Sequence, residues 1–389
     1  MVHNESLKTF ARNLAADSVG EDMEEQGGRE ARWIAGVEPP SAILTQSMTS
    51  IYEKECREQP ACLAQLLRAY EKDKSITAEL DKLRQLSLSP GPVLWIGMGA
   101  SYCSAVTGSS FLQSYGRSSF AVEASEWLHY SRPVWDEAAV SVLLTTSGES
   151  AELVQLCQQG ARQPVALVCN NEKSTCWSST QIRLPILAGP EYGNATKTYT
   201  NATAASIVLA SHMLGRAWQE DAERAMVAFS AALDSAFSVR SELEQFCRGA
   251  ANIELVGRGP AHGGAIMGAL CIREMTGNRA APHSGGGFRH GPLLDVNESH
   301  LAIVLALGRA AELGVNLALD CHARGGKVIL VGTEPRQPSE RFLPITISSV
   351  PEPWEGITSV IVPQALTLAM AEQFGAKLPP RFQYGVMKE

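Results

Sequence analysis

The sequence predicts an α/β protein made of two tandem domains, each with a doubly wound, mostly parallel sheet flanked by helices. Its 389 residues are enough for two domains of ordinary size. Short apolar runs rich in β-branched residues alternate with helix-length segments, which is typical of parallel βαβ construction. With 45% hydrophobic and 19% charged residues, the chain has ample material for a buried core.

The first series of predicted strands follows a long helical pattern. That pattern covers residues 47–86, contains no glycine and is interrupted only at Gln59-Pro60. The apolar runs after it each lead into Gly, Ser or Asn and then a helix candidate; they are residues 93–96, 120–122, 140–144 and 165–168. Residues 1–46 are polar and acidic, and we expect them to form a tail or a loose helical arm.

A second series of predicted strands follows a helical stretch expected to cover residues 198–246. Its apolar runs are residues 253–256, 301–305 and 328–331. We therefore expect a first domain at residues 47–235 and a second at residues 236–389.

Two glycine-containing motifs recur along the chain at the same spacing. The Gly97-x-Gly99 pair returns at Gly257-x-Gly259, 160 residues later. Gly148 is followed three residues later by the sequence Ala-Glu-Leu. The same arrangement occurs at Gly308, again 160 residues later. Because both matches lie at strand-to-helix junctions, they indicate a duplicated α/β domain.

Hydroxyl side chains gather at the second of these junctions in the first copy. They are those of Thr145, Thr146, Ser147 and Ser150. A helix N-terminus there offers backbone N–H groups and a favourable dipole to an anion, and the first junction adds Ser101. The equivalent residues 305–310 of the second copy have no hydroxyl. The pattern favours a phosphate site, although Ser and Thr are also ordinary helix N-caps.

The same first junction invites comparison with a dinucleotide-binding fingerprint. Gly97-x-Gly99 follows a predicted strand, and Glu123 ends the next strand. The third glycine of that fingerprint is absent, however, and a bare G-x-G is weak evidence. Dinucleotide binding is therefore the disfavoured alternative.

A carboxylate and an imidazole in the second copy are candidates for general acid/base chemistry. Glu274 lies on a predicted helix over residues 265–276, and His290 lies in a glycine-rich loop over residues 282–292. Removing a proton next to a carbonyl needs one group near the carbon and another serving the oxygen. On sequence alone, Glu274 could equally be a solvated helix residue and His290 a turn residue.

Charge and composition exclude several functional classes. A net charge of −8 argues against a broad nucleic-acid surface and leaves small anionic ligands open. Nine scattered cysteines without C-x-x-C spacing predict reduced thiols and a cytoplasmic protein. The eight histidines lack ligand spacing, so no metal site is predicted. With no signal pattern and no apolar stretch long enough to span a bilayer, neither export nor membrane insertion is expected.

Six short motifs occur in the order in which they occur in one known family. They are Gly97-Met98-Gly99-Ala100-Ser101, Val122-Glu123-Ala124-Ser125-Glu126, Thr146-Ser147-Gly148-Glu149-Ser150-Ala151, Gly189-Pro190-Glu191 with Ala195-Thr196-Lys197-Thr198-Tyr199-Thr200, Gly257-Arg258-Gly259-Pro260, and Arg289-His290-Gly291-Pro292. Over about residues 48–389 the chain thus resembles tandem sugar isomerase (SIS) domains. It is similar to the isomerase half of glucosamine-6-phosphate synthase and to related deaminases, deglycases and ketose/aldose isomerases.

The resemblance implies a role for each matching residue. The sugar phosphate would be bound by residues of the two junctions and by one lysine: Gly99, Ala100, Ser101, Thr145, Thr146, Ser147, Ser150 and Lys197. Glu274 would be the catalytic carboxylate that moves the C1/C2 proton, and His290 would assist ring opening. Because the family often supplies that histidine from the neighbouring subunit, a homodimer or higher homo-oligomer is implied. This chemistry needs no metal or redox cofactor.

The sequence also departs from the family pattern. The synthase's tail lysine aligns with Gly385; Lys388 is near but out of register, and Arg381 is a further candidate. Cys271 and Arg279 replace a family lysine and histidine. Position 2 is valine, and the residues before the first domain are too few for a glutaminase half, so we do not expect this chain alone to be a glutamine-dependent synthase.

We therefore expect an enzyme that acts on a hexose or amino-sugar 6-phosphate through an enediol or enolamine. Deamination, amine release and aldose–ketose isomerisation all remain open. The alternative is a non-catalytic SIS protein that binds a sugar phosphate and regulates a partner.

Overall fold

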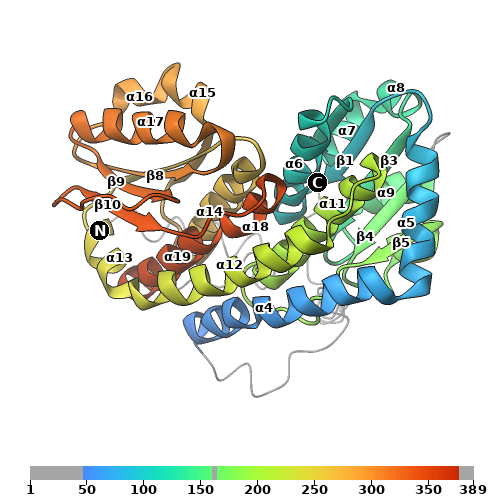
Figure 1. Cartoon of the computed structure of the whole chain (residues 1–389), viewed down its shortest axis with the longest axis horizontal. Coiled ribbons are helices and arrows are strands. Elements are labelled where there is room, and N and C mark those ends of the chain that lie inside the picture. The colour runs from blue at the N-terminus through green and yellow to red at the C-terminus, as the bar shows by residue number, and fades with distance from the viewer. Residues whose placement is uncertain (1–46, 160–163, 376–389) are drawn as a thin grey trace, which may run out of the picture.

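Two five-stranded parallel sheets form the framework of the molecule (Figure 1). A computed structural model describes residues 47–159 and 164–375. The first sheet contains β1 (Val93–Gly97), β2 (Ser119–Glu123), β3 (Val140–Thr145), β4 (Val165–Cys169) and β5 (Ile182–Pro185). The second contains β6 (Asn252–Gly257), β7 (Ala280–Ser284), β8 (His300–Ala306), β9 (Lys327–Gly332) and β10 (Phe342–Thr346).

The two sheets have the same strand order, which confirms the duplication. The first runs β2-β1-β3-β4-β5 and the second β7-β6-β8-β9-β10. All seven predicted strands are present. The three that the sequence did not predict, β5, β7 and β10, each lie at the edge of a sheet. Edge strands are covered on fewer sides, so they lack the continuous apolar runs that identify central parallel strands.

Helices cover both faces of each sheet. In the first half they are α4 (Met48–Lys72), α5 (Lys74–Ser87), α6 (Ala100–Ser114), α7 (Ala124–Tyr130), α8 (Arg132–Trp135), α9 (Ala151–Gln159), α10 (Thr175–Ser179) and α11 (Lys197–Leu214). Then follow α12 (Gln219–Ser238), α13 (Arg240–Cys247), α14 (Pro260–Thr276), α15 (Gly285–Arg289), α16 (Pro292–Asp295), α17 (Ala311–Ala323), α18 (Glu355–Thr358) and α19 (Ile361–Phe374). No helix among the described residues is long and apolar enough to cross a membrane.

Helix α4 continues through Pro60, where the sequence predicted an interruption. Proline has no N–H and cannot donate to the carbonyl four residues earlier. The side-chain amide of Gln59 donates to that Cys56 carbonyl instead, at 2.9 Å. The helical pattern breaks later, at Asp73, whose carboxylate accepts from the Ser75 N–H at 2.8 Å and caps α5.

Three helices occupy the stretch that was predicted as one. Helix α11 ends where Gly215 adopts a left-handed conformation, and α12 and α13 meet at Val239. The predicted domain boundary at residues 235/236 falls within α12, which packs against both α4 and α19. Figure 1 shows α4 and α12 running beside each other beneath both sheets.

The glycine-rich loop predicted at residues 282–292 is largely regular structure. Its first residues complete β7, and α15 and α16 follow. The Ser284 side chain accepts from the Gly287 N–H at 3.1 Å and begins α15. The sequence did not predict this short helix, because it contains three consecutive glycines and glycine has a low helix propensity.

Repeated glycines adopt matching conformations in the two halves. Gly99 and Gly259 precede α6 and α14 with φ of 52° and 53°. Gly148 and Gly308 have φ of 68° and 63°. These positive values are costly for other residues, so both motifs are explained by backbone geometry at equivalent turns.

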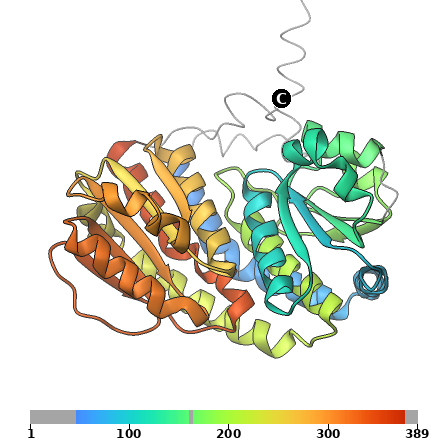
Figure 2. The same cartoon turned by 90° about the horizontal axis from the view of Figure 1, so that it is seen from above.

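The halves join along α6 and α14, which pack directly against each other (Figure 2). A Cβ built on Gly263 of α14 would lie 2.6 Å from the Cys103 carbonyl oxygen and 2.7 Å from the Thr107 hydroxyl of α6. Thr107 also donates to the Pro260 carbonyl at 3.2 Å. Glycine at 263 therefore allows the two helices to approach closely.

Candidate functional site

The predicted anion site lies where the strand order of the first sheet reverses. Strand β1 pairs with β2 on one side and β3 on the other, and the chain proceeds outward in opposite directions from these neighbours. Ligands of open α/β sheets bind at such switch points, beyond the carboxyl ends of the strands. The glycine turn (residues 97–101) follows β1 and the hydroxyl turn (residues 145–150) follows β3, so the structure brings these two predicted segments to one edge.

The hydroxyl turn is organised by its own side chains. Thr145 is buried at the end of β3, and its Oγ1 accepts from the Gly148 N–H at 3.0 Å. The Ser147 Oγ accepts from the Glu149 N–H at 3.2 Å. Thr146 and Ser150 are half-buried, and α9 begins directly after them. The turn therefore presents hydroxyls beside a helix N-terminus, as an anion site requires.

Gly148 has no space for a side chain. An added Cβ would overlap the Ser174 side chain and lie 3.0 Å from the Cys169 sulfur. The Gly148 carbonyl also accepts from the Cys176 N–H at 3.2 Å. The hydroxyl turn thus rests on the segment that joins β4 to α10.

The glycine turn is equally tight. A Cβ on Gly97 would lie 2.7 Å from the Ser101 carbonyl carbon, so α6 begins almost in contact with the end of β1. Ser101 is buried in the first turn of α6, and Ala100 packs against the apolar cluster between α6 and α14. Gly99 faces the second domain, since its Cβ would lie 4.0 Å from the Leu270 side chain.

Glu274 lies on the same C-terminal half of α14 as Leu270. It is half-buried, and its negative charge contributes to a raised pKa of thiols on both sides of the domain junction. Burial is the main cause that raises the pKa of Cys271, and the Glu274 carboxylate adds to it. Burial also raises the pKa of Cys103 on α6, with smaller contributions from Cys271 and Glu274. Leu270 and Cys271 pack with Cys103 of α6, so Glu274 lies within one helical turn of residues at the domain junction.

His290 lies elsewhere in the second domain. It is exposed and follows α15, which packs with α16 and α17. Figure 1 shows these helices on the outer side of the second sheet. Within the described chain, His290 is not among the residues gathered between α6 and α14.

Lys197 is buried at the start of α11 and has an internal counter-ion. Its Nζ lies 2.5 Å from an oxygen of Glu58 on α4. Burial opposes its charged form, but the hydrogen bond with Glu58 and the charges of Glu55 and Glu191 outweigh it and raise the pKa of Lys197. Its ammonium group is therefore held by the protein, and contact with substrate stays a prediction.

Two carboxylates that sequence reasoning did not single out shape the segment before Lys197. Glu191 is buried and accepts from the Thr196 and Thr198 N–H groups at 2.9 and 3.2 Å, which caps α11. Glu55 accepts from the Tyr192 N–H and, at 2.8 Å, from the Gly193 N–H. Glu191 lies within a motif visible in the sequence, whereas Glu55 is over 130 residues away and had no local signal.

Several remaining predictions concern absences or the tail. Arg381 and Lys388 lie outside the described residues. Within residues 47–159 and 164–375, no group of three or more histidine, cysteine or acidic side chains could hold a metal ion. All nine cysteines are free thiols.

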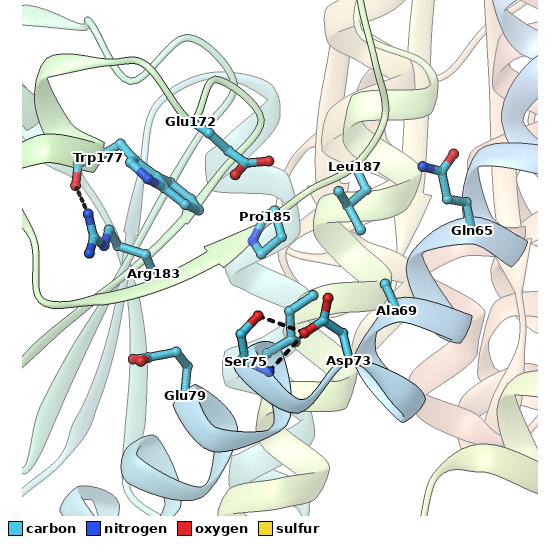
Figure 3. A pocket seen from close by; sticks show the side chains of 11 residues that line it. Gln65, Ala69, Asp73, Ser75, Glu79, Glu172, Trp177, Arg183, Pro185 and Leu187 are labelled. Carbon is cyan, nitrogen blue, oxygen red and sulfur yellow. Dashed lines mark hydrogen bonds between the residues drawn. The ribbon is translucent and has the colours of Figure 1, made fainter.

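A cavity of about 530 Å³ lies away from these turns, between α4, α5 and β5 (Figure 3). The Asp73 carboxylate, which caps α5, and Arg183, which donates to the Trp177 carbonyl at 3.5 Å, line it. None of the predicted site residues lies in its wall. It therefore forms no part of the candidate site.

Known proteins share this architecture. The chain is 28% identical over 302 residues to glutamine–fructose-6-phosphate aminotransferase (isomerizing) of Zymomonas mobilis, which covers 72% of this chain and 49% of that protein. The C-terminal domain of glucosamine-fructose-6-phosphate aminotransferase from Francisella tularensis matches with a TM-score of 0.73 and 22% identity, over 84% of this chain and 98% of that one. Glucosamine-6-phosphate deaminase of Thermotoga maritima gives 0.62 and 19%, over 79% and 96%.

These matches differ in what they cover. The chain spans about half the length of the curated relatives it matches. The solved structures are covered almost completely, which shows a shared fold. A model of the SIS domain matches residues 90–213 and 248–372, one region for each sheet and together more than half of the chain. The chain therefore belongs to the SIS domain family and contains two such domains in tandem.

Proposed function

We propose that this protein is an enzyme that moves a proton between C1 and C2 of a hexose or amino-sugar 6-phosphate. The observation that carries the proposal is the junction of α6 and α14. It holds the glycine turn of the first domain against the helix that bears Glu274 in the second. The glycine turn lies at the same sheet edge as the hydroxyl turn, so the helix with this acidic group packs beside the edge proposed for the anion. A substrate with a phosphate at one end and a carbonyl at the other would fit this division.

In this proposal the hydroxyl turn holds the phosphate, and Ser101 adds a hydroxyl from the start of α6. The N-terminal dipole of α9 favours the negative charge. Binding through hydroxyls and backbone N–H groups is compatible with the overall charge of −8. The remainder of the open sugar would extend toward α14.

The Glu274 carboxylate would then remove the proton from the carbon next to the carbonyl. The electron pair of the broken C–H bond forms the C1–C2 double bond, the π pair of the carbonyl moves to its oxygen, and that oxygen takes a proton from water to give an enediol or enolamine. Return of the first proton to the neighbouring carbon, with loss of the hydroxyl proton from the oxygen on the carbon that was deprotonated, forms the new carbonyl and completes isomerisation. A positioned carboxylate is a suitable base for the carbon proton, while a second group or water serves the oxygen.

The relatives support the substrate class. Their names refer to fructose 6-phosphate amination with isomerisation and to glucosamine 6-phosphate deamination. Both substrates carry a 6-phosphate and react at C1 or C2. We favour amine release or deamination over amino transfer, because Gly385 stands where the synthase has its tail lysine.

The position of His290 bears on assembly and on the alternative function. If ring opening uses this residue, a second subunit must bring it to Glu274, which would make the protein at least a homodimer. If no subunit does so, a protein that binds sugar phosphates without turning them over becomes the better description. The exposure of His290 outside the α6–α14 junction is the observation that favours this alternative.

The test is Glu274→Gln, assayed with fructose 6-phosphate and glucosamine 6-phosphate for isomerisation and ammonia release. We expect turnover to fall by about 10²–10⁴-fold, the usual contribution of a general base, while thermal shift still reports ligand binding. Glu312→Gln, at an exposed position on α17, is the control and should retain activity. Full turnover in Glu274→Gln would refute the assignment, and binding without turnover in the unaltered protein would support the binding-only alternative.

A further inference from the structure

Three cysteines lie beneath the hydroxyl turn, and the proposed chemistry uses none of them. Cys157 is on α9, Cys169 ends β4 and Cys176 is on α10. Cys157 is half-buried, whereas the other two are fully buried. Helices α9 and α10 pack against each other, so thiols from separate segments meet there.

Of the three, Cys157 and Cys176 interact through their side chains. Their thiols share a side-chain hydrogen bond, and the Thr180 hydroxyl donates to the Cys157 sulfur at 3.7 Å. That same hydroxyl donates to the Cys176 carbonyl at 2.8 Å, at the end of α10, so Thr180 contacts both cysteine segments. Cys169 is turned toward other partners, with its sulfur 3.4 Å from the Asn171 carbonyl and 3.7 Å from the Ser174 hydroxyl.

The pair is coupled directly to the hydroxyl turn. The Cys176 N–H donates to the Gly148 carbonyl at 3.2 Å, and the Thr175 N–H donates to the Glu149 carboxylate at 2.7 Å. Cys157 lies on the helix that begins immediately after the turn. A bond between Cys157 and Cys176 would therefore join the helix that follows the turn to the helix whose N–H groups bind Gly148 and Glu149, and so restrict the movement of residues 145–150.

We propose that Cys157 and Cys176 form a reversible disulfide that acts as a redox clamp on the hydroxyl turn. The reactivity of the two thiols is unequal. The hydrogen bond from Cys176 lowers the pKa of Cys157, while the same interaction together with burial raises the pKa of Cys176. Cys157 is also the more exposed of the two, so it is the thiol that meets an oxidant first.

With hydrogen peroxide as the oxidant, the Cys157 thiolate attacks one peroxide oxygen. The O–O bond breaks, hydroxide leaves and takes up a proton as water, and Cys157 becomes a sulfenic acid. The Cys176 sulfur then loses its proton and attacks the Cys157 sulfur, the S–O bond breaks, and a second water leaves. The two thiols lose two electrons and two protons, and one peroxide is reduced to two waters. A dithiol reverses the bond by exchange.

The first test maps the bond in the full chain. Reduced protein is treated with hydrogen peroxide, remaining thiols are alkylated, and peptides are identified by mass spectrometry. We expect a Cys157–Cys176 linked peptide that disappears on adding dithiothreitol and in Cys157→Ser. The control is Cys62→Ser, which should keep the link, because Cys62 is also half-buried but burial raises its pKa. Absence of the link, or a link from Cys157 to Cys169, would overturn the proposal.

The second test measures the clamp without any ligand. Hydrogen–deuterium exchange of the peptide covering residues 145–150 should slow by about tenfold on oxidation, equivalent to ~1.4 kcal/mol. Cys157→Ser given the same treatment should show no change, and its far-UV circular dichroism should match the unaltered protein. Unchanged exchange in a protein that has formed the link would refute the clamp. Any effect on sugar phosphate binding rests on the proposed function, whose failure would appear separately, as no binding by the reduced protein.

Discussion

Gly148 offers a quantitative test of how the hydroxyl turn is built. Its φ of 68° lies in the left-handed region, where a residue with a Cβ costs about 1–2 kcal/mol. In Gly148→Ala the new methyl would also overlap the Ser174 side chain and press on the Cys169 sulfur. Overpacking of this kind costs typically ~1–3 kcal/mol, so we expect a total loss of about 2–5 kcal/mol in the free energy of unfolding.

Gly116 provides a matched control for the backbone contribution. Its φ of 76° is similarly left-handed, but nothing lies within 4 Å of an added Cβ. Gly116→Ala should therefore cost only the backbone strain of about 1–2 kcal/mol. Gly308→Ala is a second comparison, because there the methyl meets the carboxylate of Glu355, the flexible end of a side chain.

The assay is urea denaturation followed by circular dichroism, with inorganic phosphate and fructose 6-phosphate binding measured on the folded variants. We expect Gly148→Ala to lose more stability than Gly116→Ala and to bind both ligands more weakly, since its turn must shift. The double variant with Ser174→Gly should recover the part caused by overlap. Equal losses in the two single variants would refute the argument that packing beneath the turn holds its shape.

Two further predictions concern the second domain and the domain junction. Burial and then the neighbouring Glu352 raise the pKa of Glu355 from 4.5 to about 8. The folded state therefore holds a proton that the unfolded state releases, and stability should fall between about pH 4.5 and 8, by a few kcal/mol. Glu355→Gln should remove this fall. If the urea midpoint changes equally in the two proteins between pH 5 and pH 8.5, Glu355 is not its cause. At the junction, Gly263→Ala places a methyl against the Cys103 carbonyl; we expect a loss of about 1–3 kcal/mol in denaturation and lower turnover, whereas Gly286→Ala, with only a side-chain atom 4.0 Å away, should leave turnover unchanged.

The sequence was most informative where structure is local. Central strands such as β3 and β8 are continuous apolar runs, since both of their faces are buried. The glycine motifs were visible because a turn with positive φ accepts few other residues. Three of the four edge strands, β5, β7 and β10, and the helix α15 were missed, because their residues satisfy weaker constraints. At Pro60 the Gln59 side chain binds the carbonyl that proline leaves without a donor, and no propensity scale contains such a contact.

The candidate site was predicted in its parts but not in its arrangement. The hydroxyl turn follows from one stretch of sequence, and the structure bears out its place at the end of β3. That Lys197 pairs with Glu58, and that Glu55 holds the backbone of the segment before it, depends on residues about 140 positions apart. The sequence contains no signal for such partners until the helices pack.

By itself, the sequence determined that this is a duplicated α/β protein whose first half carries the hydroxyls and whose second half carries Glu274. Only the tertiary structure decided that these halves meet along α6 and α14, so that the helix bearing Glu274 packs beside the glycine turn of the other domain. The physical reason is one of range. Turn conformation and strand burial are set by neighbouring residues, whereas the meeting of α6 and α14 depends on complementary surfaces, and on a glycine at 263, that come together only on folding.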